Sequence, residues 1–139
     1  MAFTQNTLPT RIKQPRAASV QIANADAQAQ KIVDTAGVNG SKYTSLIAVS
    51  NDTVARDVMI SRTNGGISYP LGTVSVPAGA GYSSVAPSVN LLALIGLSID
   101  SDGNPYILLI SGDTLTVSSL VTVTSAKLIT VTALSIGDF

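Results

Sequence analysis

The fold of this chain is decided by the stretch VMISRTNGGISYPLGTVSV, which occupies residues 58–76. In the first arm Val58 and Ile60 lie on one side and Met59 and Ser61 on the other, and the Asn64-Gly65 pair that follows readily takes the positive φ values of a type I′ turn. The stretch therefore predicts a β-hairpin from Val58 to Val76. Proline cannot donate to a β-ladder, so Pro70 predicts that the second arm is an edge strand or is split near Gly72.

Short β-type runs continue on both sides of this hairpin, rich in Val, Ile and Thr and separated by turn residues. Within residues 42–50, the period-two alternation of a strand places Tyr43, Ser45, Ile47 and Val49 on one face. Residues 88–95 fit either a helical turn capped by Ser88 or a buried strand, and we favour the helical turn. The expected strands beside the hairpin cover residues 19–23, 31–35, 42–50, 106–110, 114–123 and 128–136.

These elements belong to one domain, because 139 residues are enough for one hydrophobic core and too few for two. Many short strands with frequent turns are typical of an antiparallel β-sandwich or jelly-roll. At the N-terminus, Pro9 and Pro15 interrupt any helix. We therefore predict an all-β domain over residues 18–139, preceded by an extended N-terminal arm over residues 1–17.

The arm is basic, because Arg11, Lys13 and Arg16 are the only charged residues before Asp26. One interpretation is an extended segment that contacts a neighbouring subunit, and the other is a solvated terminus. Three positive charges are too few for a specific nucleic-acid site. We select Arg11, Lys13 and Arg16 as interaction residues.

The composition points to an assembled protein. Charged residues make up 12% of the chain and the formal net charge is zero, whereas a free soluble domain usually carries about 25% charged residues. Hydrophobic residues make up 45%, which excludes the composition of a disordered chain. A neutral surface rich in Ser, Thr and apolar groups indicates that other subunits cover much of it, so we expect a homo-oligomer.

Histidine and cysteine are both absent. The chain therefore lacks the commonest general base, the commonest metal ligand and any possible disulfide. We expect no enzymatic activity, no catalytic residues and no cofactor. The N-terminus has no basic region followed by an apolar run, and no apolar run is long enough for a membrane helix, so we expect a protein made in the cytoplasm that enters no membrane.

One cluster of oxygen-bearing side chains, Asp100, Asp102 and Asn104, has the spacing of the first three ligands of a calcium loop. The twelfth position of that loop is Ser111 instead of a bidentate glutamate, so we interpret the cluster as a turn and predict no metal site. The glycines of residues 79–81 lack the Lys-Ser/Thr that a phosphate-binding loop requires.

The remaining polar and aromatic candidates have ordinary interpretations. Arg56 and Asp57 could pair across a subunit boundary or form a solvated surface pair, and we favour the surface pair. Aromatic residues are too few to build a stacking platform for nucleic acid or sugar. We expect core or interface packing for the four tyrosines, Tyr43, Tyr69, Tyr82 and Tyr106.

Four turn-and-strand motifs carry a resemblance to a known group of proteins. They are Gly37-Val38-Asn39-Gly40-Ser41, Ser50-Asn51-Asp52-Thr53-Val54-Ala55-Arg56-Asp57-Val58, Gly72-Thr73-Val74-Ser75-Val76-Pro77-Ala78-Gly79, and Asp102-Gly103-Asn104-Pro105-Tyr106-Ile107-Leu108-Leu109. Together they resemble small virion proteins of tailed bacteriophages, the head decoration or cement proteins, over most of residues 30–139.

The resemblance implies a β-sandwich or jelly-roll that assembles, often as a trimer, on the outer face of an icosahedral capsid. Its partner would be the major capsid protein, and its role would be to bridge capsomers and stabilise the head. The resemblance brings no catalytic residues. It implies a location on the virion surface, after assembly in the host cytoplasm.

Two other functions fit the same sequence. A tail, neck or fibre component would also be a virion protein, although no heptad or fibrous repeat favours it. A sugar-binding or calcium-binding β-module is the alternative from another class. The copy number per particle distinguishes a head decoration protein from a tail, neck or fibre component, and titration with sugars or calcium tests the ligand-binding module.

Overall fold

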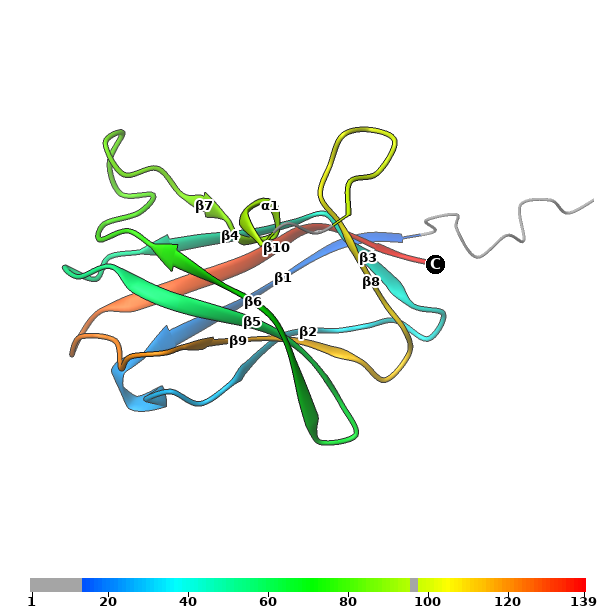
Figure 1. Ribbon diagram of the computed structural model, residues 1–139, viewed down its shortest axis with the longest axis horizontal. Helices are drawn as coiled ribbons and strands as arrows, with labels where there is room; N and C mark the ends of the chain where they lie inside the picture. Colours follow the sequence, from blue (N-terminus) through cyan, green and yellow to red (C-terminus); the bar gives the residue numbers. More distant parts are fainter. Residues whose placement is uncertain (1–13, 96–97) are drawn as a thin grey trace, which may run out of the picture.

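A computed structural model of the chain describes residues 14–95 and 98–139. Two antiparallel sheets pack face to face as a β-sandwich, which confirms the predicted all-β fold (Figure 1). Sheet A has the strand order β7–β4–β10–β3–β8, with β1 also paired to β10, and sheet B has the order β2–β9–β5–β6. The strands are β1 Gln14–Ala23, β2 Lys31–Thr35, β3 Ser41–Tyr43, β4 Ser45–Ser50, β5 Arg56–Asn64, β6 Ile67–Val76, β7 Val89–Asn90, β8 Ile107–Leu109, β9 Thr114–Ser119 and β10 Leu128–Asp138, and the helical segments are η2 Asn24–Asp26 and α1 Leu91–Leu94.

The hairpin predicted over residues 58–76 is confirmed as β5 and β6. Asn64 pairs with Ile67, and the two glycines between them have φ values of 58° and 79°, the left-handed region that a type I′ turn requires. The effect of Pro70 is also as predicted, because β6 is the edge of sheet B and the register shifts opposite Pro70.

The core lies between the two sheets and follows the expected alternation. In β10, which pairs with both β1 and β4, Ile129, Val131 and Ala133 are fully buried. Their side chains meet those of sheet B in one continuous cluster. The largest fully buried aliphatic side chains are Ile22, Leu46, Ile60, Leu91, Leu92, Leu115, Ile129 and Ile136.

One expected strand, residues 42–50, is divided into β3 and β4 at Thr44. The division changes the face of Tyr43. The sequence predicted this residue on the same face as Ser45, Ile47 and Val49, but Tyr43 is fully buried and lies on the opposite face. The neighbouring strand β10 is irregular at the same level, where Ser135 has a φ of 57°. The Tyr43 hydroxyl donates to the carboxylate of Asp34 over 2.5 Å, and this hydrogen bond stabilises the inward position of the side chain.

Three other expectations need correction. The segment before residue 96 contains both predicted alternatives, because the short strand β7 is followed by the single helical turn α1. The residue that caps this turn is Asn90 and not Ser88, since the Asn90 side chain accepts from the Leu92 N–H. Strand β9 ends at Ser119. Residues 106–110, expected as a buried strand, form only the three-residue strand β8, in which Ile107 and Leu109 are buried and Leu108 faces outward and is exposed.

The boundary of the N-terminal arm also moves. Residues 14–17, expected as the end of the arm, belong to β1, where Pro15 pairs with Gly137 and Arg16 with Ile136. Pro15 is compatible with this strand because β1 pairs only with β10 and so lies at the edge of sheet A, where proline is tolerated. Residues 1–13, with Arg11 and Lys13, lie outside the described residues. Within the described ranges, no helix is long and apolar enough to cross a membrane.

Candidate functional site

Most of the charge that the structure describes is neutralised inside the chain. With the exception of Lys127, every lysine and arginine within residues 14–95 and 98–139 forms an ion pair with an aspartate. These pairs hold loops and strand ends, so little free charge is left for the surface. The pairs are Arg16 with Asp34 and Asp138, Lys31 with Asp26, Lys42 with Asp100, Arg56 with Asp52, and Arg62 with Asp113.

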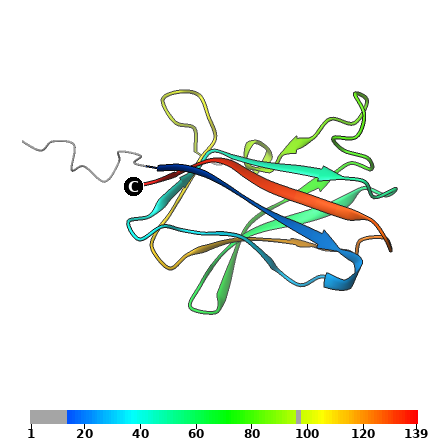
Figure 2. The ribbon, with the colours of Figure 1, turned by 180° about the vertical axis from the view of Figure 1, so that it is seen from behind.

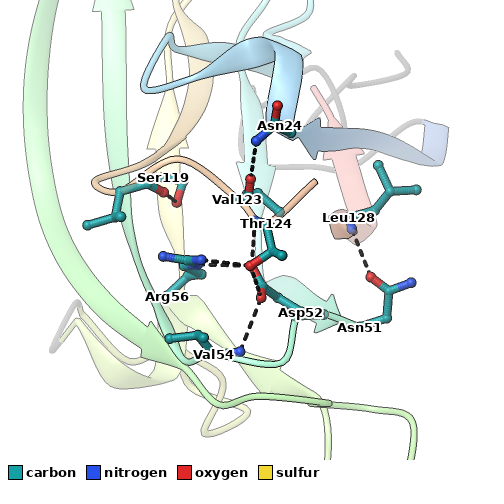
Figure 3. A network of polar contacts seen from close by, with 11 residues as sticks. Asn24, Asn51, Asp52, Val54, Arg56, Ser119, Val123, Thr124 and Leu128 are labelled. Atoms are coloured by element: carbon teal, nitrogen blue, oxygen red, sulfur yellow. Dashed lines mark hydrogen bonds and ion pairs between the residues drawn. The ribbon is translucent and has the colours of Figure 1, made fainter. Parts of the chain in front are cut away.

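Asp52 is the centre of one of these networks (Figure 3). Its side chain is fully buried, and its two oxygens accept from the Thr124 hydroxyl at 2.7 Å, the Arg56 Nε at 2.9 Å, the Thr124 N–H at 3.0 Å and the Val54 N–H at 3.1 Å. Arg56 also donates to the Thr124 hydroxyl. The network ties the turn after β4 to the loop between β9 and β10.

The expected surface pair of Arg56 with Asp57 is therefore wrong. Arg56, whose side chain is 12% exposed, donates instead to the buried Asp52 and to the Thr124 hydroxyl. Asp57 is exposed, and its backbone carbonyl accepts from the Leu120 N–H. The ion pair of Arg56 is therefore with Asp52 and lies inside the chain.

A second network joins the two sheets at the other end of the sandwich. Arg16 of β1 donates to both carboxylate oxygens of Asp138 in β10, at 2.7 and 3.0 Å, and forms an ion pair with Asp34 of β2 in sheet B. Tyr43 donates to Asp34, and Ser41 donates to Asp138 over 2.5 Å. The hydrogen bonds that Arg16 donates to the carboxylates of Asp138 and Asp34 raise the pKa of Arg16. The guanidinium selected as an interaction residue is engaged within the chain.

These networks predict that acid weakens the fold. Burial raises the pKa of Asp52, but its four donors outweigh burial and lower it, and Arg16 lowers the pKa of Asp138. A carboxylate whose folded pKa lies below the unfolded value of about 3.9 stabilises the fold above that pH and loses this contribution as the pH falls toward the folded pKa. We expect a constant unfolding midpoint from about pH 8 to about pH 5 and a steep fall below about pH 4, measured by thermal circular dichroism. A flat profile in acid would contradict the role of the networks.

The candidate functional site is the part of the outer face of sheet A that β1, β10 and β4 form, where the outward-facing residues of β1 at 19 and 21, of β4 at 45–49 and of β10 at 130–134 are all uncharged. Lys42, on β3 of the same sheet, lies outside this part and is paired with Asp100. In the central row Ser19, Thr132 and Ile47 lie side by side, and the next row joins Gln21, Thr130 and Val49. The hydroxyls of Ser19 and Thr132 bond each other at 2.9 Å, so the polar groups of this row already have partners. We call the following set the sheet A face: Ser19, Gln21, Ser45, Ile47, Val49, Thr130, Thr132 and Leu134.

The sheet A face combines apolar side chains with hydroxyl groups that already have hydrogen-bond partners. Leu134 is 47% exposed, and Ile47 and Val49 are half-buried. A second protein surface can cover such a face without burying an unpaired charge. The outer face of sheet B is less suitable, because Asp57 stands on it as an exposed charge.

The turn predicted at residues 100–104 is confirmed. The Asp100 carboxylate accepts from the backbone N–H groups of Asp102 and Asn104, both at 2.9 Å, and from the Lys42 Nζ at 2.8 Å. These donors occupy the oxygens that a cation would need. Within the described ranges there is no group of three or more His, Cys, Asp or Glu side chains that could hold a metal ion.

The tyrosines occupy different environments. Tyr43 is a core residue, Tyr106 lies under the Lys42 ammonium at 5.1 Å, and Tyr69 lies under the Arg62 guanidinium at 5.3 Å. Tyr82 is 64% exposed in the loop after β6. That loop is tied to the body of the protein, because Gly79 N–H donates to the Asp52 carbonyl.

Searches against protein families, curated proteins and solved structures find no match for this chain.

Proposed function

We propose that this protein is a structural assembly module that works by binding, with the sheet A face covered by other subunits. The observation that carries the proposal is the absence of charge from this face, together with the internal pairing of the described charges. A free protein gains solubility from surface charge, whereas a permanently covered face gains from its absence. No step of the proposal requires catalysis or a cofactor.

The specific form of the proposal is a decoration protein on the outer surface of an icosahedral phage head. The four motifs that resemble head decoration proteins support it, as does the β-sandwich fold. The partner is the major capsid protein, and a homo-oligomer, with a trimer favoured, touches several capsomers at once. Such multivalency allows modest contacts for each chain to give firm attachment.

A charge on the sheet A face tests the proposal. Thr132→Lys places an ammonium in the central row of the face, and an unpaired charge buried in an interface costs well over about 1.4 kcal/mol, the equivalent of tenfold in affinity. We expect at least about a tenfold loss of binding to heads purified from particles that lack the chain, measured by cosedimentation. The matched control is Ser75→Lys on the exposed strand β6 of sheet B, which should bind as the unmodified protein does.

The native mass and the copy number decide between the outcomes. Oligomers that bind hundreds of sites per head support the decoration role, and a few copies at one vertex support a neck or tail role instead. A monomer that does not cosediment with heads would sink the proposal.

A further inference from the structure

The edge of sheet A that β1 forms is open over its second half. Within the described residues β1 pairs with β10 alone, and Figure 2 shows it (blue) beside β10 (orange to red) at the border of the sheet. An open edge presents backbone N–H and C=O groups to which another strand can pair. The hydrogen bonds of β10 identify the residues of β1 that present these groups.

The outward-pointing backbone groups of β1 are those of Ser19 and Gln21. Leu128, the first residue of β10, donates its N–H to Asn51 Oδ1 at 2.8 Å and accepts from the Asn51 N–H, so its backbone groups point away from β1. Hydrogen-bonded and non-hydrogen-bonded pairs alternate along an antiparallel ladder. Counting from Leu128, every second pair of the β1–β10 ladder therefore lacks hydrogen bonds, and these pairs contain Gln21 and Ser19.

Two further observations agree with this orientation. The Ala23 N–H, which belongs to the same set, donates to the Asp26 carboxylate at 2.8 Å and not to β10. Ser19 and Gln21 are both exposed, and within the described residues their backbone groups have no hydrogen-bond partner. The edge thus offers two N–H donors and two C=O acceptors.

The other open edges of the two sheets carry features that oppose pairing with another strand. Strands β7 and β8 have only two and three residues, β2 has a register shift, and β6 is interrupted by Pro70. Residues 18–23 of β1 contain neither proline nor charge, and their pairing with β10 is regular. Lys31 borders this edge, but its ammonium is paired with Asp26 at 3.0 Å. Among the edges that the structure describes, residues 18–23 are therefore best suited to pairing.

A second copy of this chain is the partner that this edge fits. About a two-fold axis, two copies of one antiparallel strand present their N–H groups to each other's C=O groups, so the edge is self-complementary. The uncharged segment also meets its copy without like charges side by side. Such pairing continues sheet A from one copy into the other and extends the sheet A face, to which Ser19 and Gln21 belong.

The outward-pointing groups select one register of this pairing. An axis at Val20 pairs Ser19 of each copy with Gln21 of the other, and each of these two pairs exchanges two hydrogen bonds. A shift toward the N-terminus would pair Gln21 with Ala17 or an earlier residue, at the register shift of β1. A shift toward the C-terminus would pair Ser19 with Ala23, whose N–H is already bonded within the chain.

We propose that two copies of this chain pair edge to edge through residues 18–23 of β1, antiparallel and with the two-fold axis at Val20. The pairing goes beyond the proposed function, which leaves open the strand that joins the copies. It occurs in a dimer, or it joins two trimers into a hexamer. It needs no capsid, so its test is independent of binding to phage heads.

Proline at position 21 tests the main-chain contact. Gln21→Pro removes an N–H that the β1–β10 ladder does not use, and an edge strand tolerates proline at such a position. The paired edges lose two of their four hydrogen bonds. We expect association of the copies to weaken by at least about tenfold, measured by analytical ultracentrifugation over a range of protein concentrations.

The matched control is Ser75→Pro, on the free edge of β6. The Leu120 N–H donates to the Asp57 carbonyl, so the backbone groups of Asp57 point to β9 and those of its partner Ser75 point outward. This variant also loses one outward N–H from an edge strand. It should associate as the unmodified protein does.

Cysteine pairs test the register, because the chain has no cysteine of its own. In the proposed register positions 19 and 21 of the two copies are hydrogen-bonded partners with Cα atoms about 5.5 Å apart, within the range of a disulfide. Position 19 lies diagonally from position 19 of the other copy, at about 7–8 Å. A mixture of Ser19→Cys and Gln21→Cys should therefore form disulfides between copies about tenfold faster than either variant alone.

Three results would overturn the proposal. They are an unmodified chain that stays monomeric at every concentration, a Gln21→Pro variant that associates as strongly as Ser75→Pro, and a cysteine mixture that reacts no faster than the single variants. Circular dichroism establishes that the sandwich of each variant is intact, and the cysteine mixture tests the pairing by itself if Gln21→Pro does not fold. A monomer that still cosediments with heads would overturn the pairing alone and leave the proposed function standing.

Discussion

Replacing Asp52 with alanine is expected to lower the free energy of unfolding by about 3–5 kcal/mol, because one partner of a buried ion pair is removed and the other remains. Arg56, only 12% exposed, would lose the carboxylate that faces it. The backbone N–H groups of Val54 and Thr124 would lose their acceptor as well. These two N–H groups are only partly buried, so each adds less than the roughly 1–3 kcal/mol that a fully buried donor costs without an acceptor, and most of the loss comes from Arg56.

Urea denaturation followed by circular dichroism measures this change. The control is Asp57→Ala, five residues further along the chain, where the side chain is exposed and little change is expected. Asp52→Asn keeps the shape and should fall between the two, because the amide preserves one acceptor oxygen and loses the charge. A loss below about 1 kcal/mol for Asp52→Ala would show that the network is dispensable.

Replacing Arg16 with methionine is expected to lower the free energy of unfolding by about 2–3 kcal/mol, between the values typical of exposed and of buried ion pairs. Methionine keeps most of the apolar stem and removes the guanidinium. Asp34, whose side chain is 8% exposed, would keep only the Tyr43 hydroxyl as a donor among these contacts. The link between β1, β10 and β2 would be lost in one step.

A double-mutant cycle of Arg16→Met with Asp138→Asn isolates the coupling between these two side chains. Lys31→Met is the matched control, because its ion pair with Asp26 lies at the surface and contributes little. Equal effects of Arg16→Met and Lys31→Met would mean that Arg16 is an ordinary surface residue.

The parts of the fold that the sequence predicted well are those determined by neighbours in the chain. The turn at Asn64-Gly65-Gly66 requires positive φ values that glycine supplies, so the hairpin could be predicted from a few residues. The same holds for the effect of Pro70 on the register of β6. Both features are independent of how the sheets pack.

The sequence was least informative where a distant contact decides the structure. Pro15 indicated an extended arm, but pairing with Gly137 places it in a strand. Asp52 has the signature of a turn residue, and nothing near it in the sequence indicates that Thr124 and Arg56 converge on its carboxylate. Tyr43 changed face for the same reason, since its partner Asp34 lies in the other sheet.

The candidate site was predictable only in part. The low content of charged residues indicated a covered surface, but residues 42–50 carry apolar side chains on both faces, with Leu46 and Ala48 on one and Ile47 and Val49 on the other. Alternation separates the faces of a strand without deciding which one packs inward. Only the position of sheet B selects Ile47 and Val49 for the outside.

The central position of β10 sets the order in which the sandwich can form. The hairpin β5–β6 joins residues that are close in the chain, whereas β1 and β10 join residues more than a hundred positions apart, as Gln14 and Asp138 are. Strands β1, β3 and β4 all pair with β10, so sheet A cannot form before β10 has left the ribosome. Pairing between such distant segments is slow. The β5–β6 hairpin therefore needs no residue of β10, whereas the apolar side chains of β1 and β4 are covered in sheet A only after β10 has been synthesised.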